Sequence, residues 1–309
     1  CPQRPYPSAG ERGLRNHGWP ATTSWRDGQI LDPSVQAATA AKLRGGLPMY
    51  ALPELASLTE AWWAALRRHL WRAGAPLLPE RPEEGTDLER LWLSPKLLLA
   101  QTCGYPLTHR LKGRVRYVAT FCYGAAGCRA ASYCSFILVR SDDPASDLRD
   151  LRGRRAVINS WDSHSGMNAL RHAVAPLAKG GRFFTEVEVS GSHRASLCWL
   201  KREMADVAAV DCVTLSLLER VAPAELQGLR CLARSEAAPG LPLITRPDAS
   251  QEEVEALRRG LASACADPEL EPLRIALLLT GMEVLPPGAY DRILEMEQEA
   301  VATGYSHLR

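Results

Sequence analysis

The feature that most constrains the fold of this chain is a regular alternation of strand and helix patterns over residues 148–221. Three short apolar or β-branched runs each precede a helical pattern: 156–159 before 165–178, 184–189 before 193–203, and 206–210 before 212–221. A strand, a helix and a second strand in succession build a parallel sheet with helices on its faces. The sequence therefore predicts an α/β fold of mainly parallel sheets flanked by helices.

A polar turn joins the first of these strands to its helix. The turn is rich in hydroxyl groups and contains a glycine, with Ser160, Asp162, Ser163, Ser165 and Gly166 in succession. The first N–H groups of a helix lack intrahelical partners, and the helix dipole places partial positive charge there, so this turn is suited to an anion. Gly166 would let a ligand approach the backbone. The alternative is that Asp162 or Ser163 only caps the helix.

Polar side chains follow the other expected strands as well. In an open parallel sheet, ligands bind at the carboxyl ends of the strands. Hydroxyls, one imidazole and one carboxylate occupy these positions: Tyr50, Tyr105, Ser163, Ser165, His193 and Asp211. Such a set suits a small tetrahedral oxyanion. The alternatives are a solvent-exposed His193 at a helix start and an Asp211 that only caps the next helix.

The carboxylate among these residues restricts the kind of anion. An ionised Asp211 can only accept hydrogen bonds, so it favours a ligand that still carries an acidic O–H. Phosphonate, phosphite and phosphate meet this requirement, whereas sulfate is fully ionised at neutral pH. We therefore expect a phosphorus oxyanion.

Four segments resemble the phosphate/phosphite/phosphonate-binding family of ABC-transporter substrate-binding proteins. They are Met49–Glu54, Gln101–Pro106, Asp162–Asn168 and Gly191–Asp211. The resemblance covers the chain from about Leu47 onward. It implies a two-lobed type II periplasmic-binding-protein architecture that closes on a ligand in the cleft between its lobes. It also implies an ABC permease as membrane partner and a periplasmic or other extracytoplasmic location.

The resemblance further implies roles for individual residues. Tyr50 and Tyr105 match the first-lobe tyrosines of the family, and His193 and Asp211 match its second-lobe histidine and aspartate. The anion-binding turn corresponds to residues 163–165, namely Ser163, His164 and Ser165. The family often has a hydroxyl residue at the middle position, so here the backbone N–H of His164 would serve.

The same resemblance divides the chain. We expect an N-terminal extension at 1–46, poor in order, because it is rich in Pro, Gly, Arg and Ser without sustained periodicity. Lobe 1 would comprise 47–139 plus 236–309, and lobe 2 would comprise 140–235, with crossings near Arg140 and Arg234. The apolar runs at 115–121 and 133–139 are expected to form a hairpin or a neighbouring pair.

Composition and cysteine content set broad limits. A formal net charge of +2 over 309 residues gives no reason to expect nucleic acid as a partner. The nine cysteines form no C-x-x-C pair, so we expect neither a metal nor a cofactor. A disulfide from Cys128 to Cys103 or Cys122 is compatible with an oxidising compartment. Cys1 is compatible with a lipid anchor; the alternative is that the sequence begins at an arbitrary residue.

Two other functions remain open at this stage. A protein of the same fold can serve as a ligand-sensing domain instead of a transport component. A cysteine hydrolase built from Cys103, His193 and Asp211 is the enzymatic alternative. We expect a monomeric binding protein without catalysis.

Overall fold

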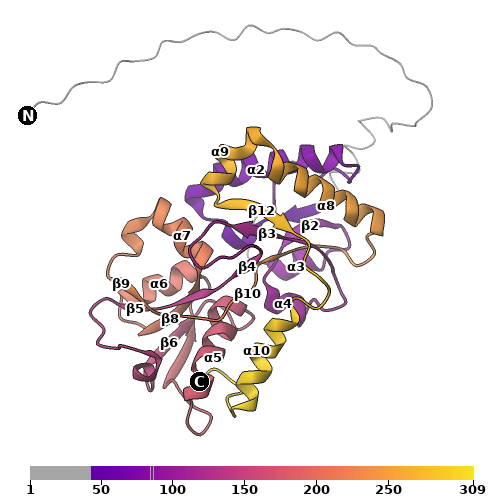
Figure 1. Cartoon of the computed structure of the whole chain (residues 1–309). Helices are drawn as coiled ribbons and strands as arrows, with labels where there is room; N and C mark the ends of the chain where they lie inside the picture. The colour runs from indigo at the N-terminus through magenta and orange to yellow at the C-terminus, as the bar shows by residue number, and fades with distance from the viewer. Residues whose placement is uncertain (1–42, 84, 86) are drawn as a thin grey trace, which may run out of the picture.

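The computed structural model describes residues 43–83, 85 and 87–309 and arranges them as two lobes, each built on a five-stranded sheet (Figure 1). The first sheet has the strand order β1-β2-β11-β3-β12. Its strands are β1 (Arg44–Gly46), β2 (Leu97–Gln101), β3 (Arg116–Tyr123), β11 (Pro242–Thr245) and β12 (Leu279–Glu283). Only β1 and β2 pair in parallel, and the other three pairings are antiparallel.

Two long helices pack against the first sheet, α2 (Ala56–Arg72) and α8 (Gln251–Ala266). In α2, Trp62, Leu66 and Leu70 recur every four residues, so they share one face and are fully buried. Shorter helical segments complete this lobe: η1 (Pro48–Tyr50), η2 (Pro53–Leu55), α3 (Leu88–Trp92), α4 (Gly104–Thr108), η7 (Pro268–Leu270) and α9 (Glu271–Ala276).

The second sheet has the order β7-β6-β8-β5-β9, and it contains the predicted alternation. Strands β6, β7 and β8 are parallel, and β5 and β9 extend the sheet in antiparallel pairings. The strands are β5 (Ser135–Arg140), β6 (Arg155–Ile158), β7 (Glu186–Val189), β8 (Val207–Asp211) and β9 (Leu229–Arg234). The helical segments are η3 (Leu148–Leu151), η4 (His164–Asn168), α5 (Ala169–Val174), η5 (Ala175–Leu177), α6 (His193–Lys201), α7 (Cys212–Val221) and η6 (Pro223–Glu225).

The prediction of an α/β, two-lobed architecture is confirmed, but the sheets are mixed and not mainly parallel. Strands β5 and β11 enter their sheets just after the chain has crossed from one lobe to the other, and both pair antiparallel with their neighbours. Strand β12 follows α8 and α9 within the first lobe and also pairs antiparallel.

The crossings lie in a two-stranded antiparallel element, β4 (Ser132–Tyr133) with β10 (Ala238–Pro239). Strand β5 therefore belongs to the second sheet, although the predicted lobe boundary assigns most of it to lobe 1. The expected hairpin of 115–121 with 133–139 is wrong for the same reason, because β3 and β5 lie in different sheets. Their apolar patterns are alike, and pattern alone does not identify the partner strand.

The first and last bounds of the predicted lobe 1, residues 47 and 309, also differ from those in the structure. Residues Arg44–Gly46, assigned to the extension, form β1 and pair with β2. A Cβ on Gly45 would lie 2.6 Å from the Leu99 carbonyl oxygen, so this close approach requires glycine. Residues 1–42 of that extension, including Cys1, lie outside the described residues.

The last helix, α10 (Asp291–Ala302), leaves lobe 1 and runs beside α5 of the second lobe (Figure 1). The segment after it adds Tyr305 and Leu308 to the second lobe's core. The Phe183 amide donates a hydrogen bond to the Arg309 carbonyl at 2.7 Å. This segment thus belongs to lobe 2, because its apolar side chains are buried there.

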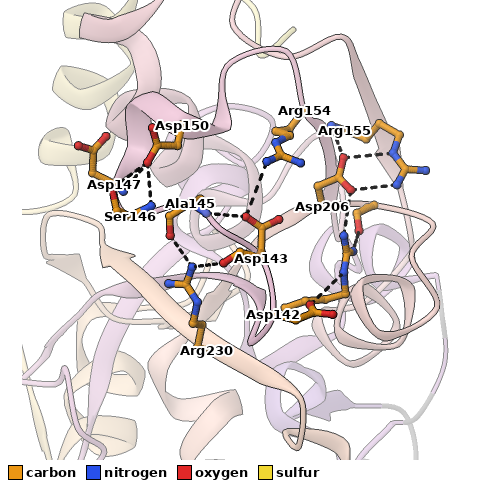
Figure 2. A network of polar contacts seen from close by, with 12 residues as sticks. Asp142, Asp143, Ala145, Ser146, Asp147, Asp150, Arg154, Arg155, Asp206 and Arg230 are labelled. Carbon is orange, nitrogen blue, oxygen red and sulfur yellow. Dashed lines mark hydrogen bonds and ion pairs between the residues drawn. The ribbon is translucent and has the colours of Figure 1, made fainter.

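An ionic network fixes the amino ends of the second sheet's central strands (Figure 2). Asp206, just before β8, accepts hydrogen bonds from the Arg155 amide and Nη2, each at 2.9 Å. Burial alone would raise the pKa of Asp206, but the bonds from Arg155 and Arg140 outweigh it and lower that pKa to about 2. The network therefore lies at the end of β6 and β8 opposite the polar turn.

Candidate ligand-binding site

The three parallel strands of the second sheet end at one edge, and polar residues follow each of them there. The turn 159–165 follows β6, residues 190–193 follow β7, and Asp211 ends β8. These segments line a cavity of about 830 Å³ whose opposite wall comes from the first lobe, including Met49, Tyr50 and Cys103. The cavity therefore lies between the lobes, at the carboxyl ends of the parallel strands, where the sequence predicts a ligand site.

Four polar side chains form a contiguous cluster in this cavity. The Ser165 Oγ lies 2.8 Å from the Nε2 of His193 and 3.5 Å from the Oγ of Ser163. The same Nε2 of His193 lies 3.4 Å from the Oδ2 of Asp211. All four residues line the cavity, and their side chains are largely buried. The cluster combines hydroxyl donors, an imidazole and a carboxylate.

The turn itself is a single π-helical turn, η4, and not the start of a regular α-helix. Ser163 is its N-cap, and its Oγ accepts a hydrogen bond from the Gly166 amide at 3.0 Å. The capping interpretation is thus correct for Ser163, while Asp162 does not cap. Within the described part of the chain, no turn or cap hydrogen bond occupies the Ser165 amide, which makes it a candidate donor to an anion.

Gly166 has a different role from the one expected. A Cβ at this position would lie 1.8 Å from the Oδ1 of Asn159. The glycine therefore makes room for the Asn159 side chain and not for a ligand. Asn159 lines the cavity, and its Oδ1 is buried without a hydrogen-bond partner in the described structure.

Asp211 both caps α7 and faces the cluster. Its Oδ1 accepts the amides of Val213 and Thr214 at 3.0 and 2.9 Å. Its Oδ2 accepts the Thr214 hydroxyl and lies on the His193 side. The two interpretations of Asp211 are therefore compatible, because each uses a different carboxylate oxygen.

The Ser–His–Asp arrangement is not that of a hydrolase triad. In a triad the serine contacts one ring nitrogen of histidine and the aspartate contacts the other. Here Ser165 and Asp211 both approach Nε2 of His193, and its buried Nδ1 has no hydrogen-bond partner in the described structure. Burial lowers the pKa of His193, although the charge of Asp211 opposes that shift. The geometry favours binding over proton relay.

Two predicted residues do not reach the cavity with their side chains. The Tyr105 hydroxyl donates to the Oε1 of Glu297 at 2.9 Å, and its ring stacks on His109. The His164 ring is turned into the interior, with its Nδ1 3.2 Å from the Nδ2 of Asn168. Its amide already donates to the Cys103 Sγ at 3.4 Å, so it is not free for a ligand.

Tyr50, by contrast, lines the cavity as expected. It lies at the end of η1, and its ring packs edge-on against Tyr123 at 5.1 Å between centroids. Burial raises the pKa of its hydroxyl well above the usual value, with a further contribution from Asp211. Tyr50 therefore faces the cavity as a neutral phenol.

Sequence reasoning missed two polar groups near the cluster. Asn159 directly follows β6 and could have been found by the strand-end argument. Tyr133, on the crossing strand β4, is 3% exposed and its hydroxyl has no hydrogen-bond partner in the described residues. Its position depends on the lobe crossing, which no local pattern indicates.

The predicted disulfides are absent from the described residues. Cys103, Cys122 and Cys128 are all free. No group of three or more His, Cys, Asp or Glu among residues 43–83, 85 and 87–309 is arranged to hold a metal ion. Over the same part of the chain, no helix has both the length and the apolar character that crossing a membrane requires.

Comparison with solved structures shows the fold. A binding-protein component of an ABC phosphonate transporter from Pseudomonas aeruginosa has a TM-score of 0.68 at 16% identity, covering 85% of this chain and 87% of that one. PhnD1 from Prochlorococcus marinus in complex with methylphosphonate has a TM-score of 0.67 at 12% identity, covering 83% and 97%. A Xanthomonas citri protein bound to ATP has a TM-score of 0.63 at 16% identity, covering 87% and 100%.

Comparison at the level of sequence identifies the family. Curated protein sequences give no significant match. A family described as "ABC transporter, phosphonate, periplasmic substrate-binding protein" matches residues 77–284, more than half of the chain. Such a family implies a small ligand, an ABC permease as partner and an extracytoplasmic location. The chain therefore belongs to the periplasmic phosphonate-binding family of ABC-transporter substrate-binding proteins.

Proposed function

We propose that this chain captures a small phosphorus oxyanion (a phosphonate, phosphite or phosphate) in the cleft between its lobes for import by an ABC transporter. The observation that carries the proposal is the cluster of Ser163, Ser165, His193 and Asp211 in a cavity between the lobes. Tyr50 faces it from the first lobe.

The chemistry of the cluster suits this ligand class. The hydroxyls of Ser163 and Ser165 and the Ser165 amide can donate hydrogen bonds to ligand oxygens. These bonds are stronger when the accepting oxygen is charged. The Oδ2 of Asp211 can accept an acidic O–H of the ligand, which a monoprotonated phosphonate has and sulfate lacks. The donors therefore bind the charged oxygens of the ligand, and the carboxylate selects a ligand that is monoprotonated.

The dimensions of the cavity support a ligand with a substituent. A cavity of about 830 Å³ lies within the usual range for small-molecule sites of roughly 300–1,000 Å³ and exceeds what a bare oxyanion fills. The similar Prochlorococcus protein holds methylphosphonate, and the Xanthomonas one holds ATP. Both are phosphorus-containing ligands, one with a small and one with a large organic group.

The cysteine hydrolase alternative is disfavoured. Burial raises the pKa of the Cys103 thiol, whereas a nucleophilic cysteine needs a lowered one. Its Sγ accepts a hydrogen bond from the His164 amide at 3.4 Å, and no hydrogen bond among the described residues joins it to His193. A transport role is favoured over a sensing role by the family. The monomeric state remains part of this proposal.

Calorimetric titration tests the ligand class directly. Methylphosphonate, phosphite and phosphate would each be titrated into the purified chain, with sulfate as the comparison anion. We expect heat and a thermal shift with at least one phosphorus oxyanion and a weaker response to sulfate. Absence of any response to all three phosphorus anions would overturn the proposal.

A serine variant tests the location of the site. Ser165→Ala should weaken binding by about 1–3 kcal/mol, because the hydroxyl donates to a charged oxygen. Ser306→Ala is the matched control, since Ser306 is exposed and its hydroxyl contacts only the neighbouring His307. Equal affinity of both variants would place the ligand elsewhere.

A further inference from the structure

Three cysteine sulfurs converge where the chain crosses between the lobes. The Sγ of Cys128 lies 3.4 Å from the Sγ of Cys212. A third sulfur lies beside them at Gly127, whose φ is +100°: a Cβ there would lie 2.8 Å from the Sγ of Cys134 and 3.4 Å from that of Cys212. We call Cys128, Cys134 and Cys212 the thiol cluster.

The members of this cluster come from distant parts of the chain. Cys128 lies in the connection from β3 of the first sheet to the crossing strand β4. Cys212, 84 positions later, is the first residue of α7 and directly follows Asp211. Its amide donates to the Cys134 carbonyl at 3.0 Å, so the backbone around the pair is also fixed.

We propose that Cys128 and Cys212 form a disulfide bond in the compartment where this protein works. A disulfide has an S–S length of about 2.05 Å, so the two sulfurs need to approach by only about 1.4 Å. The family places the chain outside the cytoplasm, where disulfides form and persist.

The oxidant is a second disulfide, either of a thiol–disulfide oxidoreductase or of a small molecule such as glutathione disulfide. The Cys128 thiolate attacks one oxidant sulfur, and the first oxidant thiol leaves. The Cys212 thiolate then attacks the Cys128 sulfur of this mixed disulfide, and the second oxidant thiol leaves. Two protein thiols are thus oxidised, one external disulfide is reduced to two thiols, and no other electron carrier is required.

Exposure distinguishes Cys128 from Cys134 as the partner of Cys212. Cys128 is partly exposed and can meet an external oxidant, whereas Cys134 is 7% exposed and Cys212 is fully buried. The hydrogen bond from Cys212 also lowers the pKa of Cys128, which favours its thiolate. The order of attack given above follows from this difference.

The proposed bond would tie the crossing segment to the helix that Asp211 caps. It would therefore hold the first turn of α7, and with it one side of the candidate site, against the connection from the first lobe. A cross-link that closes a loop of this length restricts the unfolded chain strongly.

The test uses the whole chain, equilibrated with glutathione disulfide and then digested for mass spectrometry without reduction. We expect a peptide pair joined through Cys128 and Cys212, and a mass about 2 Da below that of the reduced chain. The pair should persist in Cys134→Ser and be lost in Cys128→Ser. Reduction should lower the Tm by at least about 5 °C in the wild type and in Cys134→Ser, but not in Cys128→Ser.

Two results would overturn the proposal. One is a chain that, when unfolded after exposure to oxidant, still has both thiols open to alkylation. The other is a cross-link that maps to Cys134 and Cys212, or to any other pair. Because Cys128 is partly exposed, its serine variant is expected to fold even if a Cys212 variant does not.

Discussion

Asp211 illustrates how one side chain can serve folding and recognition together. Two amides at the start of α7 occupy its Oδ1, and this fixes the plane of the carboxylate. Its Oδ2 is thereby held on the side of His193. A ligand that contacts Oδ2 meets an acceptor that needs no reorientation, which lowers the entropic cost of binding.

Replacing Asp211 by Asn separates these two roles. Asparagine caps helices as well as aspartate, so stability should change little. The amide can no longer select an acidic O–H, so methylphosphonate affinity should fall by roughly tenfold while sulfate affinity stays equal or rises. Titration calorimetry with both anions checks this. An unchanged affinity ratio would mean that Asp211 is only a cap.

His164 makes stability depend on pH. Burial lowers the pKa of its imidazole from 6.5 to about 3. Between these values the unfolded chain binds a proton that the folded chain does not. The contribution of His164 to the free energy of unfolding is therefore fully present above pH 6.5. It is lost by about 1.4 kcal/mol per pH unit as the pH falls from 6.5 toward 3.

The His164→Gln variant should lack this dependence. Between pH 7 and pH 5, the wild type should lose about 2 kcal/mol more unfolding free energy than the variant. Denaturant unfolding at both pH values measures the difference, and His307→Gln, at an exposed position, serves as control. Parallel losses in wild type and His164→Gln would contradict the assignment.

Strand-end reasoning found the residues that the structure brings together, but it could not predict side-chain direction. Ser163, Ser165, His193 and Asp211 follow strands whose ends share one edge, which is a property of the sheet. Tyr105 turns to Glu297, 192 positions away, and such a partner leaves no local signal. The roles of these residues in binding stay a prediction.

At the scale of elements, the alternation in the second lobe was predictable because its periods are clear. Strands β6, β7 and β8 and helices α6 and α7 match the expected ranges within about three residues. The π-helical turn η4 was not predictable, because its apolar spacing is that of an ordinary helix start. The pairing partner of each strand was also not predictable, because β3 and β5 have similar apolar patterns but lie in different sheets.

Helices α2 and α8 approach so closely that only glycine fits at one point. A Cβ on Gly260 would lie 2.6 Å from the Leu70 Cα and 2.9 Å from its N, and backbone cannot yield easily. Gly260→Ala should therefore destabilise the chain by about 1–3 kcal/mol, despite the better helix propensity of alanine. Thermal or denaturant unfolding checks this.

An exposed position on the same helix provides the comparison. Ala262→Ser should change stability by less than about 0.5 kcal/mol, because Ala262 faces solvent. If Gly260→Ala proved as stable as the wild type, the two helices would pack less closely than described.

At the scale of the molecule, one ion pair links the lobes beside the candidate site. Arg194 on α6 donates to both oxygens of Glu54 on η2 in the first lobe, at 2.6 and 3.0 Å. It also contacts Glu225 within its own lobe. The pair is available only when the lobes are close, so it favours the closed arrangement.

Glu54→Gln removes the interlobe charge and leaves the Arg194–Glu225 contact intact. We expect ligand affinity to fall by at most about fivefold, because the pair is partly exposed. Small-angle scattering of the unliganded chain should show a larger radius of gyration. Glu225→Gln is the control within one lobe, and an equal effect of both variants would deny the interlobe pair a role in closure.

The segment that follows α10 also imposes an order on folding. Residues 305–309 complete the apolar core around Phe183, yet they come after every strand of both sheets in the sequence. During synthesis, the second lobe keeps part of its interior uncovered until residues 305–309 have emerged from the ribosome. The two lobes therefore cannot fold completely one after the other. The second lobe, whose turn is proposed to hold the ligand, completes its core last, although its strands precede β11 and β12 of the first lobe in the sequence.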